Sequence, residues 1–192
     1  MVYECGVILA GGKSTRMGKD KALLPFGDAP TLTHYLYERL SPLFSHLYVS
    51  AKRDKFGGAF PMIYDRDATT YSPLNALVTI LETLPFERIF IVSVDTPLID
   101  RSIIDRLYEH DASDYEALVA SLQGKRQPLC AVYQRTALPK MREQLQADRH
   151  TLRALLDRLV VCDVHFDDHD IDRFANLNRP EEYDRALMRL LE

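Results

Sequence analysis

Short runs of β-branched and aromatic residues alternate in this chain with stretches that have helical periodicity. Leu32, Leu36 and Leu40 are four residues apart, which places them on one side of a helix. Residues 89–92 (IFIV) instead form an unbroken apolar run, as in a strand that is buried on both faces. Alternation of such strands and helices produces a mostly parallel sheet that is covered by helices. We therefore predict an α/β fold with a mostly parallel sheet.

The predicted elements follow one another without a change in composition. Strands are predicted over residues 6–10, 46–50, 62–64, 88–94, 116–122, 128–133 and 160–164. Helices are predicted to begin near Thr31, around Leu74 and after an Asp100 cap, to cover residues 136–145 and 151–159, and to begin again at Pro180. No glycine-rich or serine-rich linker divides the chain, so residues 1–192 are predicted to form a single domain.

The composition argues against several classes of protein. The chain carries 24 lysine and arginine residues against 28 aspartate and glutamate residues, which gives a net charge of −4 and a pI near 5.9. Proteins that coat nucleic acid are typically basic, so no nucleic-acid partner is expected. No apolar run approaches the roughly 20 residues that span a bilayer, so no membrane partner is expected. Three widely separated cysteines and the lack of a signal-peptide pattern favour a cytoplasmic location.

The segment after the first predicted strand carries the most chemical information. Residues 9–24 read LAGGKSTRMGKDKALL and combine three glycines with the cations Lys13, Arg16, Lys19 and Lys21. Glycine lets backbone amides approach phosphate oxygens, and four cations can neutralise a triphosphate. The spacing is neither that of the P-loop nor that of the dinucleotide-binding G-x-G-x-x-G motif. Because the segment leaves a buried strand at the carboxyl edge of the sheet, we predict a polyphosphate site there rather than a flexible basic surface loop.

This segment resembles the signature L-A-G-G-x-S-x-R-M-G-x-D-K-x-L-L of the molybdenum cofactor guanylyltransferases, which are MobA-like nucleotidyltransferases. Related cytidylyltransferases and sugar-phosphate nucleotidyltransferases often read L-A-A-G or lack the aspartate before the lysine. The resemblance implies a three-layer, Rossmann-like fold and the transfer of GMP from GTP to the phosphate of molybdopterin, with Mg²⁺ and release of pyrophosphate. It also implies that the nucleotide contacts Leu9, Ala10, Gly11, Gly12, Arg16 and Lys21. Arg16 and Lys21 are expected to be catalytic and to hold the pyrophosphate.

A carboxylate follows the strand predicted over residues 88–94. Residues 91–98 (IVSVDTPL) resemble the family's strand that ends in C-D-x-P, with Asp95 as the aspartate. A carboxylate at the carboxyl end of a strand can hold Mg²⁺ against an α-phosphate. The alternative for Asp95 is a turn-forming role before Pro97. Because Asp95 and the glycine-rich segment belong at the same sheet edge, we expect Asp95 to be a catalytic residue, a nucleotide contact and a metal ligand.

Two more polar residues follow predicted strands. Asp65 matches the family position of an acidic residue near the nucleotide, and Ser50 stands where some relatives carry asparagine. Both are predicted to contact the nucleotide. Residues 72–76 (SPLNA) depart from the family's G-P-L-x-G. Loss of both glycines removes conformational freedom at a helix N-terminus that relatives place beside the nucleotide, so the sequence leaves the base selectivity open.

Candidate acceptor contacts lie in the second half of the chain. Residues 174–182 (FANLNRPEE) resemble the family's F-x-N-x-N-T-P-E-[DE]. Asn176 and Asn178 are two residues apart and would project to one face of an extended chain, where they are predicted to contact the acceptor or complete the Mg²⁺ shell. An Asx turn before the last helix is the alternative. Gln127 stands where relatives place a short polar-Pro segment before the next strand, so the resemblance makes it a further acceptor candidate.

A second cluster of polar residues is given no catalytic role. Residues 164–172 (VHFDDHDID) contain two histidines and several aspartates, but their spacing is not that of a metal site. The segment is predicted to be a solvated acidic loop.

The expected reaction needs no general base, because a phosphate monoester is already anionic at neutral pH. The terminal phosphate oxygen of the acceptor would attack the α-phosphorus of GTP in line, and positioning and electrostatic stabilisation would supply most of the catalysis. Proteins that deliver molybdopterin or mature molybdoenzymes are partners that the resemblance implies. Two alternatives stay open. One is another nucleotidyltransferase, such as a molybdenum cofactor cytidylyltransferase or a sugar-phosphate nucleotidyltransferase, and the other is a non-catalytic nucleotide-binding protein.

Overall fold

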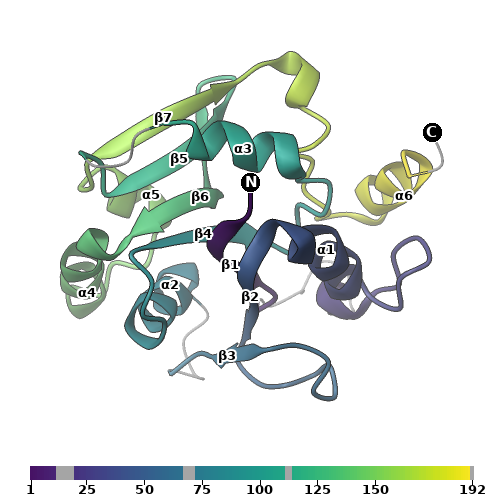
Figure 1. The fold of residues 1–192 in the computed structure, drawn as a ribbon, viewed down its shortest axis with the longest axis horizontal. Coiled ribbons are helices and arrows are strands. Elements are labelled where there is room, and N and C mark those ends of the chain that lie inside the picture. Colours follow the sequence, from purple (N-terminus) through teal and green to yellow (C-terminus); the bar gives the residue numbers. More distant parts are fainter. Residues whose placement is uncertain (12–19, 67–71, 111–113, 191–192) are drawn as a thin grey trace.

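The strands of this protein form one twisted sheet. The structure, a computed structural model, describes residues 1–11, 20–66, 72–110 and 114–190. Within these ranges the sheet has seven strands in the order β3-β2-β1-β4-β6-β5-β7 (Figure 1). The strands are β1 (Tyr3–Leu9), β2 (Phe44–Ala51), β3 (Met62–Tyr64), β4 (Arg88–Ser93), β5 (Ala117–Leu122), β6 (Lys125–Gln134) and β7 (Val161–Phe166).

The sheet is mostly parallel. β1 pairs in parallel with β2 and β4, β2 pairs in parallel with β3, and β5 pairs in parallel with β7. β6 lies between β4 and β5 and is antiparallel to both. The carboxyl ends of the other six described strands therefore meet at one edge of the sheet, which is the edge where ligands bind in folds of this kind. The α/β fold class predicted from the sequence is confirmed.

Helices cover both faces of the sheet and make it the middle of three layers. α1 and α3 lie on one face, and α2, α4 and α5 lie on the other (Figure 1). α6 packs at the end of the first of these layers through Ala186, Tyr183 and Leu187. The helices are α1 (Leu32–Leu40), α2 (Pro73–Thr83), α3 (Arg101–Tyr108), α4 (Leu138–Gln146), α5 (Leu152–Leu156) and α6 (Pro180–Met188), with short 3₁₀ turns η1 (Lys21–Leu23), η2 (Ser41–Leu43), η3 (Arg135–Ala137) and η4 (Asp168–Asp170).

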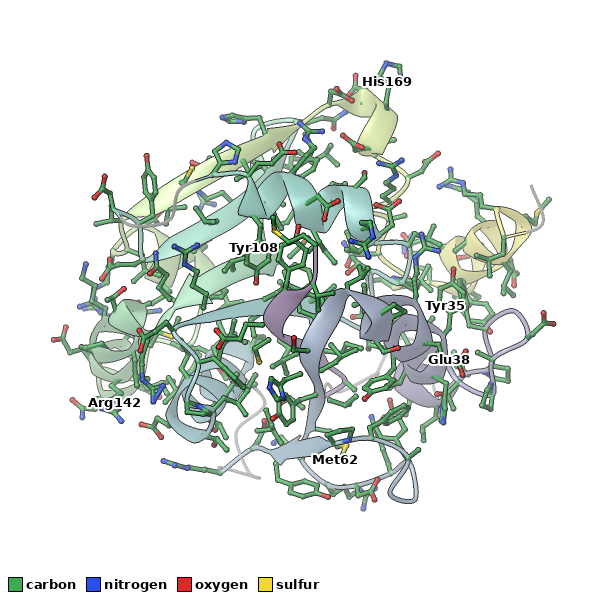
Figure 2. All side chains as sticks on the ribbon, viewed as in Figure 1. Tyr35, Glu38, Met62, Tyr108, Arg142 and His169 are labelled. Carbon is green, nitrogen blue, oxygen red and sulfur yellow. The ribbon has the colours of Figure 1, made fainter. Side chains whose placement is uncertain are left out.

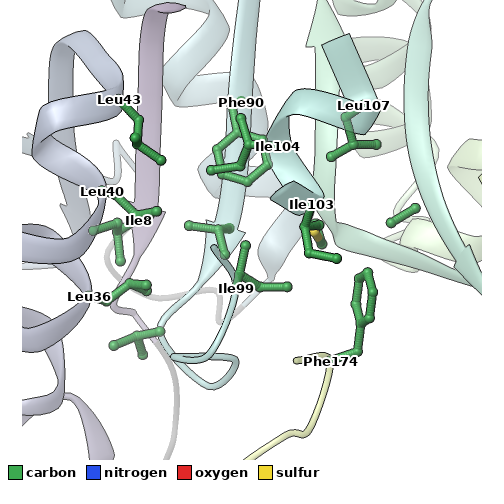
Figure 3. Close-up of a cluster of buried hydrophobic side chains, with 14 of the residues drawn as sticks. Ile8, Leu36, Leu40, Leu43, Phe90, Ile99, Ile103, Ile104, Leu107 and Phe174 are labelled. Carbon is green, nitrogen blue, oxygen red and sulfur yellow. The ribbon is translucent and has the colours of Figure 1, made fainter. Parts of the chain in front are cut away.

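The alternation of side chains along β1 divides the core in two. Ile8 points into the cluster under α1 and α3, whereas Val7 and Leu9 belong to the cluster under α2. Figure 3 shows the first cluster, in which Leu36 and Leu40 of α1 lie close to Ile8. Ionic and polar side chains such as those of Arg142 and His169 lie at the rim of the molecule (Figure 2). Burial on both faces fixes β1 at the centre and so fixes where its carboxyl end emerges.

Polar side chains cap two of the helices where the sequence predicts their start. Thr31 precedes α1 and accepts a hydrogen bond from the backbone N–H of His34 at 3.1 Å. Asp100 precedes α3 and accepts from the N–H groups of Ser102 and Ile103. Each bond satisfies an N–H that has no partner within the helix, so these predicted starts are confirmed.

Several boundaries differ from the prediction. β6 begins at Lys125 rather than at residue 128, because its first residues are polar and escape a search for apolar runs. Gln127 therefore lies within a strand and not before it. β7 extends to Phe166, and α5 ends at Leu156 instead of residue 159.

The predicted solvated loop over residues 164–172 is also wrong in part. Asp170 is buried, and its carboxylate oxygens pair with Arg106 at 3.0 Å and Arg173 at 2.9 Å. The ion pair with Arg106 attaches η4 to α3, and the pair with Arg173 is local, so Asp170 has a structural role. Across the ranges that the structure describes, no helix combines the length and apolar character needed to cross a bilayer.

Candidate active site

A cavity of about 410 Å³ opens at the carboxyl ends of the central strands. Leu9, the last residue of β1, is paired in register with Ser50 of β2 on one side and with Ser93 of β4 on the other. All three residues line the cavity, so the pairing of the sheet itself brings their side chains together. Among the residues that the structure describes, the lining consists of Leu9, Gly11, Ser50, Lys52, Asp65, Ser72, Pro73, Ala76, Ser93, Asp95 and Leu129.

Three polar side chains from distant parts of the chain meet beside this cavity. The ammonium Nζ of Lys21 lies 2.9 Å from Oδ1 of Asp95 and donates a hydrogen bond to Oδ1 of Asn178 at 3.1 Å. The Lys21 side chain is 11% exposed and that of Asp95 is 30% exposed. Partial burial strengthens the attraction between them relative to an ion pair in water. The structure thus brings Lys21 and Asp95 together at the sheet edge where the sequence places both, and it adds Asn178 to the pair.

The backbone around Asp95 is fixed on two sides. The N–H of Asp95 donates to Oγ of Ser93 at 3.2 Å, which turns the chain as β4 ends. The carbonyl of Asp95 accepts from the N–H of Leu177 at 2.9 Å, which attaches the segment before α6 to this turn. Asn178 is the next residue, so this backbone hydrogen bond also places the side-chain amide of Asn178 beside Lys21. Asp95 therefore combines the turn-forming role with a side chain that faces a cation.

Ser50 and Asp65 line the other side of the cavity. Oγ of Ser50 lies 3.4 Å from Oδ1 of Asp65, and the N–H of Asp65 donates to the carbonyl of Ala51 at 3.2 Å. A Cβ added to Gly11 would lie 3.9 Å from Oδ2 of Asp65 and 3.7 Å from Cα of Ala51, which are ordinary contacts. Packing against the described residues does not by itself require glycine at position 11, whereas a close approach by a ligand would give a reason for it.

The other residues predicted to contact the nucleotide or the acceptor do not line this cavity, or lie outside the described residues. Ala10 donates its N–H to the carbonyl of Ser50 at 2.9 Å and so continues β1 past its last paired residue. Asn176 lines a separate cavity of about 340 Å³ beside α6 and is not among the residues that line the cavity at the central strands. Gln127 is half-buried on β6 and donates its amide N–H to the carbonyl of Lys125 at 3.3 Å. Gly12 and Arg16 lie outside the described residues.

Some residues of the site were not predicted. Lys52 and Ser93 line the cavity. Lys55 binds the carbonyl of Ala10 and the carboxylate of Asp20 just outside it. Two of them could have been found from the sequence. Lys52 and Lys55 follow the second predicted strand and so belong at the same sheet edge as the glycine-rich segment.

The donor set beside the cavity suits a divalent cation of the magnesium type. Asp95 and Asn178 each direct one oxygen at a single cationic nitrogen, that of Lys21. A carboxylate and an amide oxygen are the kind of ligands that Mg²⁺ takes from proteins, together with phosphates and water. The residues present therefore fit this metal in chemistry, with Asp95 as the charged ligand and Asn178 as a neutral one.

Comparisons with known proteins extend these observations. Residues 6–165 match the family model of the MobA-like NTP transferase domain. Over 180 residues, 93% of each chain, the sequence is 34% identical to the molybdenum cofactor guanylyltransferase of Campylobacter jejuni subsp. jejuni serotype O:6 (strain 81116 / NCTC 11828). It is 29% identical over 185 residues to a probable molybdenum cofactor guanylyltransferase of Carboxydothermus hydrogenoformans, which covers 94% of this chain and 93% of that one.

A solved structure shares the fold. The molybdopterin-guanine dinucleotide biosynthesis protein A of Archaeoglobus fulgidus has a TM-score of 0.81 at 19% sequence identity, over 97% of this chain and 98% of that one. The family match runs from within β1 to within β7, so it includes Asp95 and the cavity but stops before Asn178.

Proposed function

This chain belongs to the MobA-like NTP transferase family and is a nucleotidyltransferase, and from this premise we propose that it transfers GMP from GTP to the phosphate of molybdopterin. The product would be the guanine dinucleotide form of the cofactor, with pyrophosphate as the leaving group. The observation that carries the proposal is the meeting of Lys21, Asp95 and Asn178 beside a cavity at the carboxyl ends of β1, β2 and β4. We take residues 1–192 to act as one domain and the cytoplasm as the place of the reaction.

The proposed nucleotide site runs along the sheet edge. The nucleoside would lie in the cavity against Ser50 and Asp65, whose side chains already face each other there. The triphosphate would extend past Leu9, Ala10, Gly11 and Gly12 toward Lys21. A cavity of about 410 Å³ is within the usual range for a small-molecule site.

The charge on the phosphates would be balanced by side chains and a metal ion. Lys21 would hold the pyrophosphate together with Arg16, which lies outside the described residues. Asp95 would hold Mg²⁺ with the amide oxygen of Asn178, and the bound ion would neutralise charge on the α-phosphate. Mg²⁺ usually takes only one or two carboxylates from a protein, which fits a site with Asp95 as its charged ligand.

The reaction would form a bond from a phosphate oxygen of molybdopterin to the α-phosphorus of GTP, while the bond from that phosphorus to the pyrophosphate oxygen breaks. The attacking oxygen is already anionic, so the chain has to align the two phosphates and stabilise charge. Asn178 and Gln127 are the proposed acceptor contacts. Gln127 stands between Arg126 and Pro128, which line a further cavity of about 520 Å³ on the same edge. Proteins that deliver the pterin or receive the product are the proposed partners.

Calorimetric titration with GTP, CTP, ATP and UTP, with and without Mg²⁺, tests the proposal. We expect GTP to bind most tightly and Mg²⁺ to strengthen its binding. Asp95→Asn should weaken Mg²⁺-dependent binding by about tenfold or more, because a charged interaction is lost. Asp28→Asn, which changes an exposed carboxylate in the same way, should bind as the unaltered protein does.

The other outcomes point elsewhere. Preference for CTP, or equal binding of all four nucleotides, would indicate another nucleotidyltransferase. Failure to bind any nucleotide would contradict the phosphate site itself.

A further inference from the structure

Lys55 joins Ala10 and Asp20, which lie on either side of the glycine-rich part of the sequence. Its Nζ donates a hydrogen bond to the carbonyl of Ala10 at 2.9 Å and lies 2.5 Å from Oδ2 of Asp20. Ala10 follows β1, and Asp20 precedes η1. One ammonium group therefore holds the chain at both of these residues.

The position of Lys55 is itself fixed by the turn that carries it. Both carboxylate oxygens of Asp54 accept backbone hydrogen bonds, from Phe56 at 2.7 Å and from Gly58 at 2.8 Å. Gly57 and Gly58 have positive φ angles of 65° and 79°, which glycine adopts without strain. The Lys55 side chain is 14% exposed, so its ammonium has given up most of its water for these partners.

Asp20 connects Lys55 to the backbone that carries Lys21. Oδ1 of Asp20 accepts from the N–H of Ala22 at 3.1 Å and caps η1, while Oδ2 faces Lys55. η1 begins at Lys21, whose Nζ reaches Asp95. The Asp20 carboxylate therefore holds the backbone at the start of η1, from which Lys21 extends. Lys55 in turn holds this carboxylate.

The same ammonium is connected to the other wall of the site through Ala10. The N–H of Ala10 donates to the carbonyl of Ser50, and its carbonyl accepts from Lys55. Ser50 lines the cavity. Lys55 therefore links the end of β1 to η1, which begins at Lys21. Lys55 itself does not line the cavity.

We propose that Lys55 is a positioning residue for nucleotidyl transfer, which holds Lys21 opposite Asp95 by tying Asp20 to the carbonyl of Ala10. The inference rests on the proposed function for its effect on turnover. The contact network that carries it can be measured without any substrate.

The kinetic test compares Lys55→Met with Arg53→Met. Methionine keeps much of the length of lysine but has no charge, and Arg53 is an exposed cation on the same turn. A small misplacement of a catalytic group can reduce turnover by about a hundredfold, so we expect Lys55→Met to lower kcat/KM for GTP by about 10- to 100-fold. Lys55→Arg should restore part of the loss because it keeps the charge. Arg53→Met should keep the unaltered value.

Amide hydrogen exchange supplies the second measurement. Loss of Lys55 should free the Asp20 carboxylate and lower the protection of the Ala22 N–H by about tenfold, which corresponds to a weakened local hydrogen bond. The N–H groups of Phe56 and Gly58, which Asp54 holds, should keep their protection. A uniform loss of protection over the whole chain would instead show a general structural role and would overturn the proposal.

A double-mutant cycle distinguishes the network from two independent effects. If Lys55 acts through Asp20, the pair Lys55→Met and Asp20→Asn should be little worse than the more severe single variant. Additive losses, or unchanged turnover in Lys55→Met, would contradict the inference. Failure of the unaltered protein to bind nucleotide would count against the proposed function alone, because the exchange of Ala22 still tests the contact.

Discussion

At the scale of single residues, Asn176 and Asn178 have different surroundings although one residue separates them. Asn178 is held at both ends, since its N–H donates to Glu182 at 2.7 Å and its side-chain oxygen accepts from Lys21. Asn176 lines the cavity beside α6 together with Glu182 and Arg185. Of the two asparagines, Asn178 is therefore the one placed to act on the phosphates or the metal.

Exchange of each asparagine for alanine separates their roles. Asn178→Ala should lower kcat/KM for GTP by about tenfold or more, because it removes a hydrogen bond to the buried charge of Lys21. Asn176→Ala makes the same chemical change two positions earlier and should alter kcat/KM by less than about threefold. Steady-state kinetics with varied GTP measures both. Equal losses in the two variants would contradict the assignment.

The sequence predicts the meeting of Lys21 and Asp95 because both follow strands that end at the same sheet edge. It does not predict the role of Lys55, since nothing in the pattern of the turn indicates that its ammonium reaches Ala10 and Asp20. The separation of Asn176 from Asn178 also escapes prediction. An alternating pattern places two residues on one face only if the chain is extended, and no strand forms over these residues.

At the scale of elements, the hairpin between β5 and β6 decides the direction of β6. Gln123 and Gly124 connect the two strands with φ angles of 50° and 71°. Two consecutive positive φ angles are typical of the type I′ turn, whose twist matches that of antiparallel strands. The sequence suggested a longer connection, because Lys125, Arg126 and Gln127 are polar and hide the start of β6.

Substitution within this turn should reveal its energetic importance. Gly124→Ala places a Cβ on a residue with positive φ and should lower the free energy of unfolding by about 1 kcal/mol. Gln123→Asn should change it by less than about 0.5 kcal/mol, since asparagine tolerates this backbone region well. Urea unfolding followed by circular dichroism measures both. An unchanged midpoint for Gly124→Ala would show that the turn adopts another conformation.

At the scale of the whole molecule, the three cysteine thiols differ in how deeply they are buried. Cys5 on β1 is 0% exposed and Cys130 on β6 is 2% exposed, whereas Cys162 on the edge strand β7 is half-buried. Burial raises the pKa of the Cys5 thiol to about 12 and also raises the pKa of the Cys130 thiol. The pKa of the Cys162 thiol is raised too, but this thiol is accessible to solvent. Because the thiolate is the reactive form, both central thiols should be nearly inert while the sheet is intact.

Reaction with Ellman's reagent at pH 8 should therefore show one fast thiol and two slow ones. The fast phase should disappear in Cys162→Ser, and all three thiols should react quickly in denaturant. The slow phases should follow the rate at which the molecule opens. Rapid reaction of all three thiols in the native protein would mean that the sheet is far less protected than its burial indicates.

The contact of Lys21 with Asn178 joins residues that are 157 positions apart. Closing so long a segment costs entropy before the contact can form, and the loss is recovered only when the sheet and the segment before α6 are already in place. We therefore expect the cluster around Asp95 to be among the last features to assemble as the chain folds. Catalytic competence, more than helix content, would mark a molecule that has finished folding.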